Sequence, residues 1–137
     1  MVKHCPVQIA FLIDDSEVDL FVQKKFLEIR QFANQIVTFT SAVQALEVLT
    51  ANQNSESPGI VFLDLNMPVV NGFEFLEQMR ESSTSVFDRI KVVILTSSTS
   101  LADRERAQSF NNVISFIPKP LTVQGLDDLA KLIETKI

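Results

Sequence analysis

Five polar residues that could act together on one ligand each follow an apolar run of this 137-residue chain. They comprise two adjacent carboxylates, a third carboxylate, a hydroxyl and an ammonium: Asp14, Asp15, Asp64, Thr96 and Lys119. Carboxylates about 4 Å apart repel by roughly 4 kcal/mol at an effective dielectric of about 20, so three of them in one place imply a bound cation. Oxygen ligands suit Mg²⁺, which usually takes one or two carboxylates and completes its shell with water and phosphate oxygen.

Such an ion would make room for a dianionic phosphoryl group. Lys119 would supply a point charge for another phosphate oxygen, and Thr96 would donate a hydrogen bond to a third. Asp64, which follows the middle run of the group, is left as the nucleophile that becomes an aspartyl phosphate. Each of the five residues also has an ordinary structural interpretation, as a helix cap, a turn or a solvated charge. Their joint occurrence at predicted strand ends favours a common site.

These side chains meet only if the strands before them are neighbours in one sheet. Compact apolar runs alternate with segments of helical period, which predicts an α/β fold, a flavodoxin-like doubly wound parallel sheet of five βα units. The predicted strands are residues 7–13, 36–40, 60–63, 90–95 and 113–117. In the strand order 2-1-3-4-5, the four strands that carry the polar residues are contiguous, and ligands of such sheets bind beyond the carboxyl ends of the strands.

Helical spacing predicts a helix after each strand. The first helix follows Ser16 as N-cap, and its apolar residues are Val18, Val22, Phe26 and Ile29. The second follows Ser41, which forms a capping-box signature with Gln44. Its apolar residues are Ala42, Ala45, Leu46 and Leu49. After the loop 64–72, the third helix carries Phe75, Leu76 and Met79.

The two C-terminal helices differ in how firmly they should be held. Residues 100–108 are rich in charge and offer a core only Leu101, Ala102 and Ala107. Few apolar contacts mean a low cost of displacement, so we expect this helix to be the least firmly held. The last helix is capped by Thr122, and its apolar residues are Leu126, Leu129, Ala130 and Ile133.

Composition excludes several classes of function. The net charge of −5 disfavours nucleic acid and anionic membranes as main partners. With three glycines in the chain, no glycine-rich phosphate loop can be assembled. The single Cys5 excludes an intrachain disulfide, and with His4 it makes too few ligands for zinc. No apolar run approaches the length of a membrane span, and the run 7–13 lacks a cleavage site, so we expect a cytoplasmic protein.

Four motifs, in this order along the chain, resemble those of the receiver domains of two-component response regulators. They are the pair Asp14-Asp15, the run Asp64-Leu65-Asn66-Met67-Pro68 followed by Gly72, the strand end Leu95-Thr96-Ser97, and Phe116-Ile117-Pro118-Lys119-Pro120. The resemblance covers essentially the whole chain. It implies a stand-alone receiver of the chemotaxis or phosphorelay kind, a single domain over residues 1–137 without an output domain.

The resemblance also implies a role for each matching residue. Asp64 matches the phosphoacceptor, Asp15 a direct ligand of Mg²⁺ and Asp14 a ligand acting largely through water. Asn66 matches the position whose backbone carbonyl binds the metal. Thr96 and Lys119 match the hydroxyl and ammonium that bind the phosphoryl group.

Further matches concern switching and phosphate lifetime. Ser98 matches a position that affects the lifetime of the acyl phosphate, and Phe116 the aromatic residue that swings inward when Thr96 moves toward the phosphate. The Lys119-Pro120 bond matches one that is usually cis. The sequence departs from the common pattern at Phe116, often Tyr in relatives, and in residues 81–88, which look longer and more polar than usual. These departures concern the surface that contacts partners.

The expected function is a signalling switch that accepts a phosphoryl group from a sensor histidine kinase or a histidine phosphotransfer protein and then changes its partner-binding face. It would not be an enzyme acting on other substrates. The alternative is a Mg²⁺-dependent phosphatase of the haloacid-dehalogenase type. That enzyme needs a second aspartate two residues after the nucleophile as general acid, a position that Asn66 occupies here. A third hypothesis, an adaptor that is not phosphorylated, would leave the site residues without a purpose.

Overall fold

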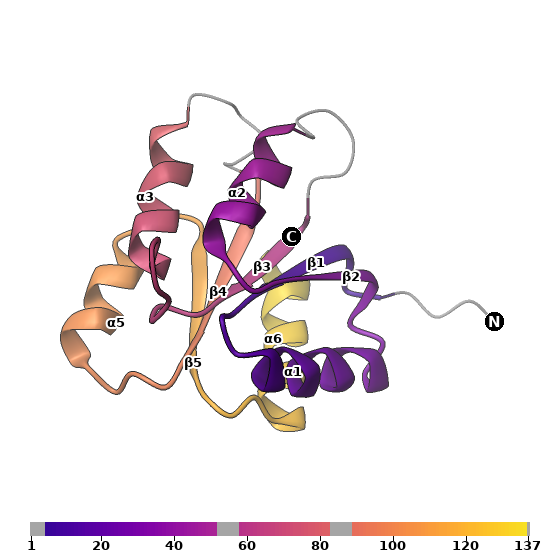
Figure 1. The fold of residues 1–137 in the computed structure, drawn as a ribbon. Helices are drawn as coiled ribbons and strands as arrows, with labels where there is room; N and C mark the ends of the chain where they lie inside the picture. The colour runs from indigo at the N-terminus through magenta and orange to yellow at the C-terminus, as the bar shows by residue number, and fades with distance from the viewer. Residues whose placement is uncertain (1–4, 52–57, 83–88, 137) are drawn as a thin grey trace.

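Five strands form one parallel sheet in the order β2-β1-β3-β4-β5 (Figure 1). The computed structural model describes residues 5–51, 58–82 and 89–136. The strands are β1 (Val7–Ile13), β2 (Ala33–Phe39), β3 (Ile60–Leu63), β4 (Lys91–Thr96) and β5 (Val113–Pro118). The predicted fold class and strand order are confirmed. Two predicted strands match their bounds, whereas β2 begins three residues before the predicted position 36 because its polar first half lacks an apolar signal.

Helices cover both faces of the sheet. They are α1 (Glu17–Ile29), α2 (Ala42–Ala51), α3 (Gly72–Glu81), α5 (Leu101–Gln108) and α6 (Val123–Lys136). Figure 1 shows α1 and α6 on one face, and α2, α3 and α5 on the other. Most of the polar segment 81–88 and the residue His4, both noted in the sequence, lie outside the described residues.

Side-chain alternation along the strands divides the core in two. Phe11 and Ile13 of β1 pack with α2 and α3, whereas Ala10 and Leu12 pack with α1 and α6. Successive side chains of a strand point to opposite faces of the sheet, so a central strand must be apolar at every position to fill both cores. All four residues of β3 are buried, as this requires.

Helix α1 buries only part of the apolar stripe that predicted it. Val18 and Ile29 are 73% and 69% exposed, and the helix turns Leu20, Gln23 and Leu27 toward the sheet. The helix is apolar on two faces: Phe26 of the predicted stripe packs against the core, whereas Val18 and Ile29 do not, so the periodicity predicted the helix but only part of its inward face. The inward face of α1 places Gln23 next to Asp14, at the end of β1.

Helix caps follow the sequence in part. Ser16 accepts a hydrogen bond from the backbone N–H of Asp19, as an N-cap should. Thr122 likewise accepts from the N–H of Gly125. The hydroxyl of Ser41 accepts from the N–H of Val43, whereas a capping box would require the N–H of Gln44.

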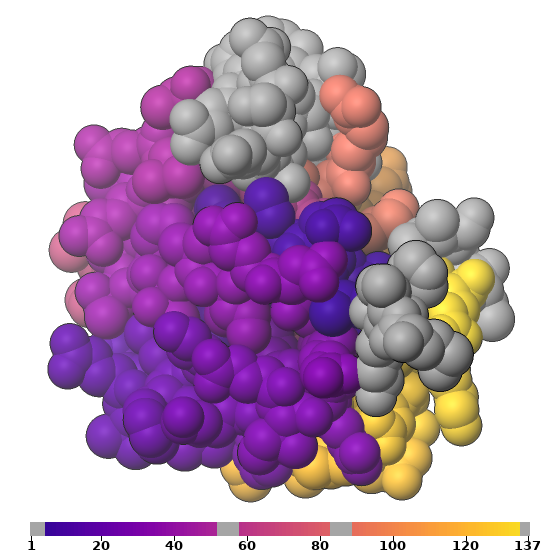
Figure 2. All heavy atoms as spheres, turned by 90° about the vertical axis from the view of Figure 1, so that its right-hand side faces the viewer, coloured from indigo at the N-terminus to yellow at the C-terminus, as the bar shows by residue number. Residues whose placement is uncertain are grey.

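The structure explains why residues 100–108 are predicted to be weakly held. Of the helix α5, only Ala107 is buried, and Leu101, predicted to reach the core, is 69% exposed. By contrast, α6 buries Leu126, Leu129 and Ile133 in the core that it shares with α1 on the other face of the sheet. At the surface between the two helices, Arg30 and Asp127 lie 3.4 Å apart. Figure 2 shows α6, in gold and yellow, at the lower right of the molecule, next to segments coloured violet. Within the described ranges, no helix has the length and apolarity needed to cross a membrane.

Candidate functional site

The ends of β1 and β3 bring two aspartates to one edge of the sheet. The backbone N–H of Asp14 donates to the carbonyl of Phe39, and that of Asp64 donates to the carbonyl of Ile13. These bonds extend the ladder beyond the last strand residues. They fix where each aspartate backbone lies, so both side chains start from a rigid frame rather than from a loop.

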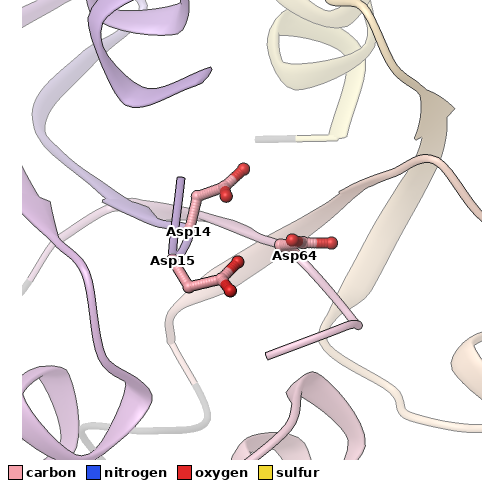
Figure 3. Close-up of side chains that lie close together, drawn as sticks. All are labelled: Asp14, Asp15 and Asp64. Atoms are coloured by element: carbon pink, nitrogen blue, oxygen red, sulfur yellow. The ribbon is translucent and has the colours of Figure 1, made fainter. Parts of the chain in front are cut away.

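Three carboxylates converge at this edge (Figure 3). One oxygen each of Asp14, Asp15 and Asp64 lies within 4.8 Å of the others. Asp14 and Asp64 are buried and Asp15 is exposed, so the group opens to solvent on one side. An all-oxygen set with one accessible member fits a hard divalent cation that keeps part of its water shell. The predicted convergence of these three residues is found.

Burial is the main influence on the ionisation of Asp64. Desolvation raises the pKa of this carboxyl above its ordinary value, and the neighbouring Asp14 raises it further. Lys119 and the N–H of Asn66, which donates to Asp64 Oδ1 at 3.3 Å, act in the opposite direction. The carboxylate therefore carries a cost that an added positive charge would relieve.

Asp14 is held by two donors in addition to the lysine. Its Oδ1 accepts from the backbone N–H of Ser16 at 2.9 Å, and its Oδ2 accepts from the side-chain amide of Gln23 at 3.2 Å. Gln23 is buried on the inward face of α1. Sequence reasoning missed this residue because it searched strand ends, and a polar residue on the buried face of α1 is the signal that could have found it.

Lys119 links the carboxylates from the end of β5. Its ammonium lies 2.7 Å from Asp14 Oδ2, 2.9 Å from Asp19 Oδ2 and 3.4 Å from Asp64 Oδ2. Burial alone would lower the pKa of this ammonium, but the contacts with Asp14 and Asp19 outweigh it and raise the pKa above its ordinary value. The peptide bond to Pro120 is cis, as expected, and the Lys119 N–H donates to the carbonyl of Thr96. The lysine is thus fully charged at neutral pH and anchored to the neighbouring strand.

Asp19 is the member of this constellation that the strand-end search did not identify. It lies in the first turn of α1, five residues after the acidic pair begins. The side chain is 41% exposed, yet its carboxylate contacts a lysine that is only 16% exposed. Acidic residues are common in the first turn of a helix, where they interact favourably with the helix dipole. The sequence alone therefore does not indicate that Asp19 belongs to the site.

The hydroxyl residues connect the site to α5. Thr96 is fully buried, and its Oγ1 accepts from the N–H of Ser98 at 3.2 Å. Ser98 in turn donates from its hydroxyl to Asp103 at 2.7 Å, in the first turn of α5. Movement of Thr96 would therefore disturb the loop that begins this helix.

Phe116 lies on β5 beside the same helix. Its side chain is half-buried against the core, and the Arg104 guanidinium carbon is 5.7 Å from the ring centroid. A hollow of about 270 Å³ adjoins the ring, and its lining combines the loop after β4 with α5: Ser98, Thr99, Ser100, Leu101, Arg104, Phe116 and Pro118. There is thus open space next to the aromatic side chain.

The loop after β3 is closed by Gly72. Its N–H donates to the carbonyl of Leu65, and a Cβ at this position would lie 2.6 Å from the carbonyl oxygen of Asp64. Asn71 caps α3 and forms with Glu74 the capping box that was expected at α2 instead. A glycine against the backbone of Asp64 and a firm cap after it hold this aspartate in place.

Comparison with known proteins gives one consistent family. The sequence profile of the response regulator receiver domain matches residues 10–131. The probable methanogenesis regulatory protein FilR2 of Methanothrix harundinacea is 33% identical over 120 residues, covering 86% of this chain and 76% of that protein. The two-component response regulator ARR6 of Arabidopsis thaliana is 30% identical over 126 residues, covering 85% of this chain and 64% of that protein.

Solved structures agree with the sequence relatives. A two-component response regulator from Cytophaga hutchinsonii superposes with a TM-score of 0.86 at 25% identity, covering 94% of this chain and 98% of that one. A response regulator receiver protein from Dyadobacter fermentans gives a TM-score of 0.80 at 33% identity, covering 93% of this chain and 98% of that one. The likeness extends over nearly the whole sheet and its helices.

Proposed function

Since this chain belongs to the response regulator receiver family and is therefore a protein of two-component signalling, we propose that it accepts a phosphoryl group on Asp64. The observation that carries the proposal is the position of this carboxylate. It is buried at the sheet edge, 3.4 Å from a charged lysine and close to two further carboxylates that could hold a divalent cation.

The reaction is an in-line displacement at phosphorus. An Asp64 oxygen forms the new P–O bond while the N–P bond of a phosphohistidine breaks and the imidazole leaves with the electron pair. Lys119 and Thr96 bind the equatorial oxygens, on which the negative charge is spread. Since the protein only has to position these groups, the receiver itself supplies the catalysis of transfer.

The proposed cation is Mg²⁺. Asp14, Asp15 and Asp64 would hold it together with the backbone carbonyl of Asn66, Asp14 acting largely through water. When bound, the ion neutralises charge on the transferred phosphoryl group. The exposed side of the carboxylate group leaves room for water and phosphate oxygen in the ion's shell.

Phosphorylation would be sensed through Thr96. If its hydroxyl moves toward the phosphoryl oxygen, its bond with Ser98 is lost, and Phe116 can take up the vacated space. The helix α5, with one buried residue, shifts at low cost. The outcome is a population shift that changes which partner binds, for which a preference of a few kcal/mol suffices.

The proposed phosphoryl donor is a sensor histidine kinase or a histidine phosphotransfer protein. The output is a further protein whose affinity depends on the phosphorylated state. A net charge of −5 supports a protein partner rather than nucleic acid or a membrane surface. We also propose that the chain acts in the cytoplasm and turns over no substrate beyond its own phosphorylation and dephosphorylation.

Incubation with acetyl phosphate and Mg²⁺ tests the proposal. Intact-mass measurement should show the gain of one phosphoryl group by the wild-type chain and no gain by Asp64→Ala. Asp128→Ala, at an exposed acid on α6, serves as the control and should gain as much as wild type. An equal gain by the Asp64 variant would remove the assignment.

A further inference from the structure

We propose that Asp19 is a positioning residue that keeps Lys119 beside Asp64 while the other acids of the site are engaged. The inference rests on the proposed function, because it assigns to Asp19 a part in phosphoryl acceptance. It concerns a carboxylate that lies outside the group of Asp14, Asp15 and Asp64.

The first observation is that the lysine has one carboxylate for each of its ammonium protons. An ammonium group has three donors and no acceptor. Lys119 meets Asp14 at 2.7 Å, Asp19 at 2.9 Å and Asp64 at 3.4 Å. Asp19 is thus a closer partner of the lysine than the nucleophile is.

The second observation is that the backbone of Asp19 is fixed at the start of α1, next to Asp14. Its backbone N–H is bound by the hydroxyl of Ser16, the N-cap of α1. Ser16 also donates its own N–H to Asp14. The helix start that orients Asp14 therefore also orients Asp19, so the two acids hold the lysine from one rigid turn.

Competition for the lysine then decides the role of Asp19. A cation held by Asp14 and Asp64 draws on two of the three lysine partners and also repels the ammonium directly. Asp19 is the carboxylate that remains. Without it, the flexible four-carbon side chain of Lys119 would gain rotamer entropy by turning toward solvent. The Lys119 ammonium would then no longer lie beside Asp64 when the phosphoryl group is transferred.

Phosphorylation rates in a double-mutant cycle provide the test. With acetyl phosphate and Mg²⁺, Asp19→Asn should accept the phosphoryl group about tenfold more slowly than wild type, less than the 10²-fold that a 1 Å misplacement can cost. Asp19→Glu should recover part of the rate. Glu17→Gln removes the same charge two residues away on the exposed side of the same turn and should stay within about twofold of wild type.

The cycle is completed in the Lys119→Met background. If Asp19 acts through the lysine, adding Asp19→Asn there should change the rate by less than about twofold. An equal loss in both backgrounds would overturn the inference. A wild-type rate in Asp19→Asn would also overturn it while leaving the proposed function intact. If wild type gains no phosphoryl group, the proposed function fails, and the inference falls with it.

A second readout does not depend on phosphorylation. Nitrogen-15 NMR of lysine side chains reports whether the Lys119 ammonium is held against exchange with water. With Mg²⁺ present, we expect a resolved Lys119 signal in wild type and Glu17→Gln and its loss in Asp19→Asn. A signal that persists in Asp19→Asn with Mg²⁺ would show that Asp19 is not the retaining partner.

Discussion

At residue scale, Gly72 is a position where a side chain has no room, because it lies against the backbone of residues 64 and 65. A Cβ there would lie 2.6 Å from the carbonyl oxygen of Asp64 and 2.8 Å from Leu65 Cα. Neither neighbour is the end of a flexible side chain, so the backbone itself would have to move. Gly72→Ala should therefore lower the free energy of unfolding by about 1–3 kcal/mol, the usual cost of overpacking.

Gly59→Ala is the matched control for this prediction. The nearest atoms to its Cβ belong to Val7, at 3.6 Å, which is ordinary van der Waals contact. The change in stability should stay below about 1 kcal/mol. The chain has neither Trp nor Tyr, so urea unfolding is best followed by far-UV circular dichroism. Equal losses in the two variants would show that the close approach at Gly72 does not govern stability.

The raised pKa of Asp64 predicts how stability depends on pH without divalent ions. Burial makes the folded state bind this proton more tightly than the unfolded state does. The resulting stabilisation is present below the unfolded pKa and is lost as the pH rises through the raised folded pKa. Asp64→Asn removes the titration, so it should unfold at higher urea concentration than wild type at pH 7.

Measurements at several pH values separate the effect of Asp64 ionisation on stability from an effect of the substitution that does not depend on pH. In chelator, the advantage of Asp64→Asn should shrink as the pH falls to about 4, near the unfolded pKa of an aspartate. The measurement is the urea midpoint at several pH values. A difference between the variant and wild type that is constant over this range would mean that ionisation of Asp64 is not its cause.

The meeting of polar residues from different strand ends could be predicted, because it follows from the order of the strands in the sheet. Once strand order is 2-1-3-4-5, Asp14, Asp64 and Lys119 must lie at one edge. Asp19 and Gln23 could not be found in this way, because they reach the site from within a helix. Their contribution depends on the rotation of α1 about its axis, which an apolar pattern on two faces does not determine.

At element scale, α3 and α5 differ in how they are held on the same face of the sheet. Five residues of α3 are buried, against one of α5. Helix α5 is attached by Arg106, which contacts Glu77 at 2.8 Å and lies over the Phe73 ring at 4.2 Å. The Arg106 side chain is 55% exposed and that of Glu77 is 39% exposed, and ion pairs this accessible to solvent contribute about 0–1 kcal/mol. Helix α5 is therefore held on the sheet mainly by contacts at the surface and only to a small extent by buried apolar side chains.

Hydrogen exchange should reveal this difference. Amides of α5 should open with a free energy lower than those of α3 by at least about 1.4 kcal/mol, a tenfold higher open population. The measurement is native-state exchange of the wild-type chain, compared helix by helix, with α3 as internal control. Equal protection of the two helices would contradict the proposal that α5 is the element free to shift.

The bounds of strands and helices are predicted well only where the apolar pattern itself begins and ends at them. The strand β3 was predicted to the residue because it is short, apolar and flanked by polar segments. The polar first half of β2 carries no such signal, and pairing with β1 from Ala33 onward extends the strand. A capping box was predicted at Ser41 but forms at Asn71. Residue type alone does not determine a cap, because the cap also depends on the conformation of the turn before the helix.

At the scale of the whole molecule, the fold assembles the site from segments far apart in sequence. Asp14 and Lys119 are separated by four βα units, yet lie 2.7 Å apart. The two cores on either face of the sheet keep the strand ends in register, so a ligand that binds there stabilises the folded chain as a unit. Unfolding separates these groups, and the unfolded chain has no comparable site.

Mg²⁺ should therefore raise the free energy of unfolding. At a free concentration of about 100 times its Kd, the expected increase is about 2.7 kcal/mol. Asp15→Asn removes the exposed carboxylate of the cluster with little effect on packing, so at the same Mg²⁺ concentration most of this gain should be lost. Glu17→Gln, which changes the same charge outside the cluster, should keep it. Urea unfolding by circular dichroism with Mg²⁺ or chelator measures the difference, and a gain that survives in Asp15→Asn would place the ion elsewhere.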